Sequence, residues 1–142
     1  MVKSGDAMKF SYEIEANNFD TAGEVSSKLK RVLKQLGLNS KVIRRIAVAA
    51  YEAEINVIIH SDGGFMEASI SQDEVNISFV DKGPGIKDIP LAMTEGFSTA
   101  SDQVRELGFG AGMGLPNIRR CTDDMELKSS EEGTVLKMLF KL

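Results

Sequence analysis

The chain has 142 residues, of which 42% are hydrophobic and 27% charged, and this globular composition excludes intrinsic disorder and collagen-like repeats. A net charge of -4 argues against direct nucleic-acid binding, no apolar run approaches the roughly 20 residues of a membrane span, and the single cysteine excludes an internal disulfide. Because the start also lacks the apolar stretch of a signal peptide, we expect one domain over residues 1–142 in a soluble, cytoplasmic protein that does not bind membranes.

The first third of the sequence predicts a strand and then a helix. Residues 8–15 alternate apolar and polar side chains, which is typical of a half-buried strand, here a peripheral one. Thr21 followed by Glu24 matches a capping box. The helix predicted after it carries apolar residues at Val25, Leu29, Val32, Leu33 and Leu36. Gly37 supplies the expected left-handed C-cap.

A longer helix and a hairpin follow. An apolar helical pattern begins near Asn39 and continues to the turn at residues 61–64, which predicts a mostly buried helix. Residues 66–70 and 75–79 each alternate apolar and polar side chains around a turn near Gln72, so they predict an antiparallel hairpin. The second of these strands places Asp81 at its carboxyl end.

The last part of the chain combines a long loop with a compact ending. Periodicity disappears from Gly83 to about Met113, and a loop of this length inside a compact domain is usually functional, so we expect a lid over about 86–113. Residues 115–122 predict a short helix with a proline in its first turn. Two closing strands are expected at about 125–129 and 134–142.

Glu52 and Asn56 are the first candidate site residues. Their i, i+4 spacing puts them on one face of the second predicted helix, among alanines and isoleucines. Buried polar side chains need partners. A hydrogen bond confined to the helix face would satisfy this pair, so the pair alone does not decide between structure and function.

Asp81-Lys82-Gly83-Pro84-Gly85 is the second candidate. As a plain turn it would be ordinary, because Asp, Gly and Pro are the residues that turns use. The functional interpretation is that the glycines let backbone approach a flat ligand while the carboxylate accepts a hydrogen bond from an exocyclic amine such as that of adenine. Both interpretations fit the residues equally well.

The third candidate is the glycine-rich stretch 108–116, in which glycines alternate before a helix begins. Backbone N–H groups at a helix start can bind an anion, and phosphate binding is favoured over a flexible linker because the helix follows directly. The stretch lacks the Gly-Lys-Ser/Thr of a P-loop. It also lacks the spacing and the preceding strand of a dinucleotide fingerprint.

Taken in chain order, these motifs resemble the GHKL (histidine-kinase-like) ATPase superfamily, and within it the anti-sigma-factor serine/threonine kinases and switch kinases of bacteria. Residues 51–60 are similar to its asparagine box, and 95–100 resemble the lid entrance of the switch kinases. The glycine boxes and the closing-strand motif are matched by Asp81-x-Gly83-x-Gly85, Gly110-x-Gly112-x-Gly114-Leu115 and Gly133-Thr134. The resemblance runs from about Met8 to Leu142. It implies an α/β (α+β) two-layer sandwich, the Bergerat fold, with a mixed, largely antiparallel sheet and helices on one face.

The resemblance also implies ATP and Mg²⁺ as cofactors and a role for each motif residue. Asn56 would hold Mg²⁺, an ion that prefers oxygen ligands. Asp81 would bind the adenine amine, and Thr134 would support adenine recognition. Gly83 and Gly85 would shape the base pocket. The residues expected at the triphosphate are Gly110, Gly112, Gly114 and the adjoining Leu115.

Glu52 is the expected catalytic base, because phosphoryl transfer needs a residue that orients the incoming hydroxyl. Glu54 lies about 160° from Asn56 around the helix axis, so it should point away from the metal and has no expected catalytic role. We expect His60 to be a helix-end residue whose hydrogen bonds are satisfied locally, rather than a phospho-acceptor. The role of Arg105 is left open.

The function implied is an ATP-dependent serine/threonine protein kinase, an anti-sigma regulatory factor that phosphorylates a small antagonist protein in a bacterial partner-switching pathway. The alternative is a nucleotide-gated binding module that changes partners with little turnover. A fragment of an ATPase motor is disfavoured, because such chains carry an additional transducer domain. Partners implied are an antagonist with an acceptor Ser or Thr and a sigma factor or a regulatory phosphatase, and a homodimer is also expected.

Overall fold

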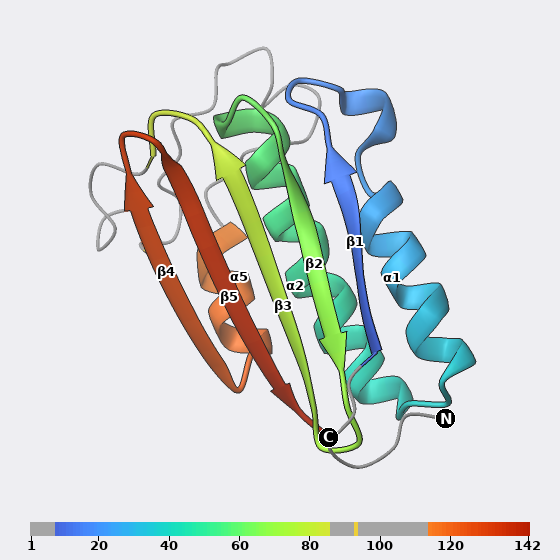
Figure 1. Ribbon diagram of the computed structural model, residues 1–142. Helices are drawn as coiled ribbons and strands as arrows, with labels where there is room; N and C mark the ends of the chain where they lie inside the picture. The colour runs from blue at the N-terminus through green and yellow to red at the C-terminus, as the bar shows by residue number, and fades with distance from the viewer. Residues whose placement is uncertain (1–7, 86–92, 94–113) are drawn as a thin grey trace.

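The computed structural model describes residues 8–85, 93 and 114–142 (Figure 1). Five strands form one sheet in the order β1-β2-β3-β5-β4, and each neighbouring pair is antiparallel. The strands are β1 (Met8–Ile14), β2 (Gly64–Ile70), β3 (Glu74–Lys82), β4 (Asp124–Ser130) and β5 (Gly133–Lys141). The predicted strands, the hairpin of β2 and β3 and the peripheral position of β1 are therefore confirmed.

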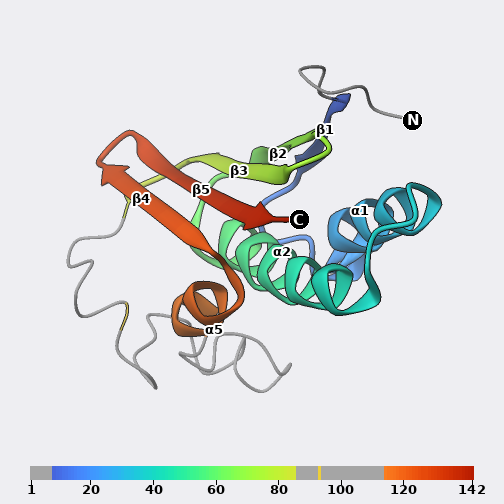
Figure 2. The same cartoon turned by 90° about the horizontal axis from the view of Figure 1, so that it is seen from below.

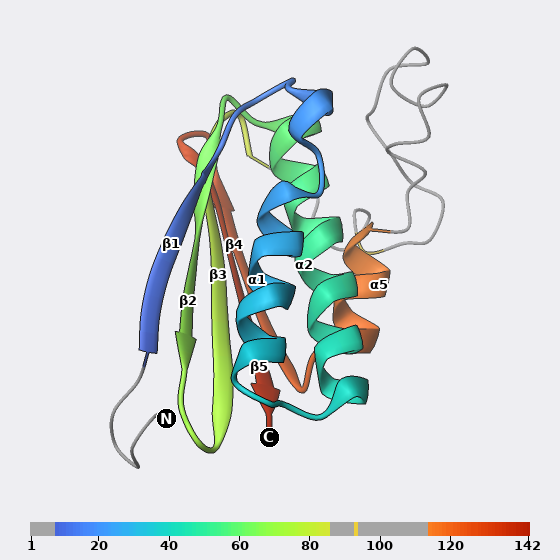
Figure 3. The same cartoon turned by 90° about the vertical axis from the view of Figure 1, so that its right-hand side faces the viewer.

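The helices α1 (Glu24–Gln35), α2 (Ser40–His60) and α5 (Gly114–Cys121) all lie on one face of this sheet (Figures 2 and 3). A short 3-10 turn, η1 (Phe19–Thr21), precedes α1. Helix α2 lies in the middle of the helical layer, between α1 on the β1 side and α5 on the β4 side (Figure 2). The structure thus confirms the two-layer sandwich with a largely antiparallel sheet. None of the described helices is both long and apolar enough to cross a lipid bilayer.

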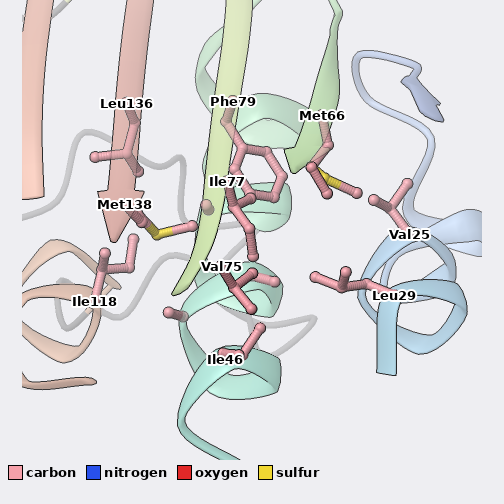
Figure 4. Packing of buried hydrophobic residues seen from close by; sticks show 14 of the residues in the cluster. Val25, Leu29, Ile46, Met66, Val75, Ile77, Phe79, Ile118, Leu136 and Met138 are labelled. Atoms are coloured by element: carbon pink, nitrogen blue, oxygen red, sulfur yellow. The ribbon is translucent and has the colours of Figure 1, made fainter. Parts of the chain in front are cut away.

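One hydrophobic cluster joins the two layers. Alternate residues of β3 point toward the helices, and Val75, Ile77 and Phe79 are all buried there. Figure 4 shows these side chains facing Ile46 of α2, with Leu29 of α1 beside them. Removal of such side chains from water is the main term that holds the layers together.

The end of α1 follows its prediction, whereas the start does not. Gly37 N–H donates to Lys34 O at 3.0 Å and Leu38 N–H to Leu33 O at 3.3 Å, which is the double hydrogen bond of a Schellman C-cap. At the other end, Gly23 occupies the N-cap position without a side-chain hydrogen bond. The Thr21 hydroxyl instead donates to Asn18 O. The capping-box prediction is therefore wrong.

The reason is that a distant carboxylate caps α1. Glu54 of α2 accepts hydrogen bonds from the backbone N–H groups of Gly23, Val25 and Ser26 at 3.0 to 3.2 Å. These are N–H groups that a helix start leaves without intrahelical partners. A capping box can be proposed from local sequence, whereas this contact joins two helices that only the tertiary fold brings together.

Candidate functional site

Those candidate site residues that the structure describes gather at one end of the sandwich. The C-terminal half of α2 lies there beside the end of β3 and the start of β5. The N-terminus of α5 is directed toward the same end of the sandwich (Figures 1 and 3). The junction is held by Asp62 N–H, which donates to Lys82 O at 2.6 Å. The carboxyl end of α2 and the carboxyl end of β3 are therefore fixed relative to each other.

Glu52 and Asn56 meet the start of α5. A β-carbon added to Gly114 would lie 3.3 Å from Glu52 Oε2 and 3.3 Å from Asn56 Oδ1. A Cβ contact of that length is tighter than most, so glycine lets the α5 backbone approach both side chains. The structure thus brings together residues from the predicted asparagine box and the second glycine box.

Burial sets the electrostatics of Glu52. The half-buried carboxyl has its pKa raised above the ordinary glutamate value, because burial disfavours the charged form. The side-chain hydrogen bond with Asn117 opposes this shift and lowers the pKa. Asn117 was missed from the sequence, although it lies one helical turn after Gly114 and that spacing could have indicated it. A carboxylate with a raised pKa, held in place by an amide, can act as a base.

Asp81 and Thr134 are directly paired across β3 and β5. Thr134 N–H donates to Asp81 Oδ1 at 3.0 Å, and the Thr134 hydroxyl lies 2.7 Å from the Ser129 hydroxyl. Burial raises the pKa of Asp81, the Thr134 hydrogen bond lowers it, and the nearby charge of Asp62 raises it again. This half-buried carboxylate has a fixed orientation, because one oxygen is held by the backbone of β5.

Gly133 permits this pairing. Its φ is 153°, in the region that favours glycine, and a β-carbon there would overlap the backbone oxygen of Asp81. Gly83 and Gly85 follow β3 at the same end of the sheet, and Gly83 packs against Ser61 at the end of α2. The first glycine box and the closing-strand motif are therefore neighbours in space.

Glu54 points away from this site, as expected. It is 1% exposed, and its carboxylate is fully engaged at the start of α1. Glu54 lies on the same helix as Glu52, but its role is to cap the start of α1. The sequence indicated only that Glu54 points away from Asn56, and nothing in the sequence indicated its hydrogen-bond partners.

Asn56 is the candidate ligand for a hard cation among the described residues. No group of three or more His, Cys, Asp or Glu residues that could hold a metal occurs in the part of the chain that the structure describes. The Asn56 side chain makes no hydrogen bond with other described residues, and its amide oxygen is a ligand type that Mg²⁺ accepts. One protein oxygen suits an ion whose other ligands come from substrate phosphates and water.

Part of the predicted site lies outside the described residues. Gly110, Gly112, Arg105 and the lid at 86–113 belong there, apart from residue 93, and so does the stretch 95–100. Leu115 is described as the second residue of α5, packed against the core. His60 is the last residue of α2.

Comparison of the sequence with known proteins identifies a family that matches this chain. Residues 16–140 match the model of the histidine kinase-like ATPase domain. The serine/threonine-protein kinase RsbT of Bacillus subtilis is 31% identical over 115 residues, which cover 78% of this chain and 80% of that protein. An anti-sigma F factor of a Thermoanaerobacter strain is 33% identical over 110 residues, 73% of each chain.

A solved structure agrees at the level of the fold. The crystal structure of the RsbU and RsbW domains of Rv1364c from Mycobacterium tuberculosis superposes with a TM-score of 0.66 at 16% identity. The match covers 95% of this chain and 32% of that one, so it spans about a third of the larger protein. Membership of an ATPase family implies the use of ATP. By sequence and by fold, the chain belongs to the histidine kinase-like ATPase domain family.

Proposed function

We propose that the chain is an ATP-dependent serine/threonine protein kinase that phosphorylates a small antagonist protein in a partner-switching pathway. The approach of Gly114 to both Glu52 and Asn56 carries this proposal, because it joins an amide that suits Mg²⁺, a carboxylate with a raised pKa and backbone N–H groups at a helix start. Phosphoryl transfer needs these groups together. The names of the relatives, a serine/threonine-protein kinase and an anti-sigma F factor, support the same class of function.

Each described residue then has a role. Asp81, oriented by Thr134 N–H, accepts a hydrogen bond from the adenine amine. Gly83 and Gly85 border the base, while the N–H groups at Gly114 and Leu115 face the phosphates. Asn56 holds Mg²⁺, which when bound neutralises charge on the transferring phosphoryl group. Glu52 orients the acceptor hydroxyl and takes its proton, and Asn117 holds Glu52 in position.

The acceptor in this proposal is a Ser or Thr of the antagonist, and a sigma factor or a regulatory phosphatase is the partner whose binding then changes. Transfer breaks the bond between the γ-phosphorus and the bridging oxygen of ATP and forms one to the acceptor oxygen. ADP leaves, and the acceptor proton passes to Glu52.

The substitution Asn56→Ala tests the metal part of this proposal. We expect Mg·ATP affinity to fall roughly 10- to 100-fold, because the variant lacks the amide oxygen that would bind Mg²⁺. Isothermal titration with and without EDTA measures this effect, and EDTA should weaken ATP binding by the unmodified chain far more than by the variant. Asn76→Ala, on the exposed face of β3, is the matched control. Unchanged Mg·ATP affinity in Asn56→Ala would contradict the role of Asn56.

A further inference from the structure

A groove of about 650 Å³ runs between α1 and α2 on their solvent-facing side. Basic side chains on its rim come from both helices: Lys30, Lys34 and Arg44. Its apolar lining includes Leu38, Val48 and Tyr51. Val48 and Tyr51 are 40% and 39% exposed, so this part of the lining offers apolar surface to a partner.

The basic residues of this groove have no acidic partners in the part of the chain that the structure describes. Among the described residues, no carboxylate forms an ion pair with Lys30, Lys34 or Arg44, whereas the neighbouring Arg45 pairs with Asp123 at 3.2 Å. The chain as a whole carries a net charge of -4. A cluster of cations that form no ion pair with any described carboxylate, on a protein that is acidic overall, is a local electrostatic signal that favours an acidic ligand.

The groove leads to the candidate catalytic base. Lys34 and Arg44 lie toward the turn that joins α1 and α2, and Glu52 lines the other end of the same groove. Arg44 precedes Glu52 by roughly 12 Å along the helix axis, at 1.5 Å per residue. A chain lying in the groove could therefore place acidic side chains at the basic rim and a hydroxyl at Glu52.

We propose that this groove is the docking subsite for the phospho-acceptor protein, and that it selects an acceptor segment whose acidic residues lie about 12 Å from the acceptor Ser or Thr. The inference rests on the proposed kinase function. The acidic residues of the segment bind to Lys30, Lys34 and Arg44. Apolar side chains that lie between these acidic residues and the acceptor hydroxyl bind to Val48 and Tyr51. The apolar lining favours a peptide over a nucleic acid, whose phosphate backbone has no use for it.

A binding experiment without nucleotide separates docking from catalysis. The probe is a fluorescein-labelled helical peptide with one Ser, leucines on one face and glutamates clustered about 12 Å from that Ser. A second peptide replaces each Glu with Lys, and single-stranded DNA of matched length is a third probe. Fluorescence anisotropy at low salt measures the affinity of each, because screening weakens exposed charge pairs.

We expect the acidic peptide to bind and the Lys peptide and DNA to bind at least about tenfold more weakly. The double variant Lys34→Glu/Arg44→Glu should lose about tenfold or more in affinity for the acidic peptide. Arg31→Glu/Lys41→Glu, also exposed on α1 and α2 but outside the groove, makes the same change in net charge and should bind as the unmodified chain does.

Equal loss in the two double variants, or equal binding of the acidic and basic peptides, would overturn the docking proposal. So would DNA that binds as tightly as the acidic peptide. The affinity of both double variants for Mg·ATP should stay unchanged. If the chain binds the acidic peptide in the groove but fails to bind Mg·ATP, the kinase proposal fails while the binding groove remains.

Discussion

Replacement of Glu52 by Gln should lower the rate of ADP formation from Mg·ATP with an acceptor present by roughly 10²- to 10⁴-fold, the contribution typical of a general base. The amide keeps the shape of the side chain but cannot take a proton. Affinity for Mg·ATP should change by less than about threefold, because the proposed contacts of Asn56 and Asp81 are untouched and the proposed base acts mainly in the transition state. Rapid-quench kinetics and calorimetry on the same samples separate the two effects.

The pH dependence gives the same substitution a second readout. Burial raises the pKa of Glu52, so the ionised base is lost as the pH falls through a value above that of free glutamate. The unmodified chain should therefore lose activity on the acidic side, whereas the residual rate of Glu52→Gln should lack this decrease. Glu67→Gln, exposed on β2, is the control. If Glu52→Gln forms ADP at the normal rate and partner exchange persists, the chain is a nucleotide-gated binding module.

Replacement of Glu54 by Ala should destabilise the fold by about 3–5 kcal/mol, the combined cost of buried N–H groups left without an acceptor and of a cavity in the core. The substitution leaves the N–H groups of Gly23, Val25 and Ser26 without their acceptor at the positive end of α1, and it opens a cavity in place of a side chain that is 1% exposed. Urea unfolding followed by circular dichroism measures the change in the free energy of unfolding.

Glu24→Gln is the matched control for this prediction. Glu24 is exposed in the first turn of α1, so its charge interacts with the same helix end without accepting a described hydrogen bond, and its loss should cost about 0.5 kcal/mol. Glu54→Gln should fall between the two, since one of its terminal atoms becomes a donor facing backbone N–H groups. A loss below about 1 kcal/mol in Glu54→Ala would contradict the capping role.

Local sequence predicted those parts of the fold that local physics controls. The alternation in β2 and β3 and the apolar spacing of α2 indicated elements that the structure confirms, and Gly37 ends α1 as its sequence indicated. The pairing of β3 with β5 was not predictable from periodicity, because residues 83–132, which include α5 and β4, separate these two strands in the sequence. The resemblance to a known family, rather than periodicity, supplied the overall sheet architecture.

The site was predictable where a motif keeps its residues close in sequence. The i, i+4 spacing placed Glu52 and Asn56 together, but their contact with Gly114 depends on how α5 docks beside α2. The hydrogen bond between Asn117 and Glu52 and the caps supplied by Glu54 also join residues far apart in sequence. A side chain's partner across the fold cannot be inferred from the spacing within one helix.

The most direct test of an adenine-nucleotide site is a calorimetric titration of the unmodified chain and Asp81→Asn with Mg·ATP and Mg·ADP. We expect the unmodified chain to bind both, and Asp81→Asn to lose roughly 10- to 100-fold in affinity, because in our proposal the half-buried, oriented carboxylate accepts a hydrogen bond from the adenine amine. Asp73→Asn, exposed in the β2–β3 turn, should bind as the unmodified chain does. Absence of binding by the unmodified chain, or equal affinity in Asp81→Asn, would contradict the account.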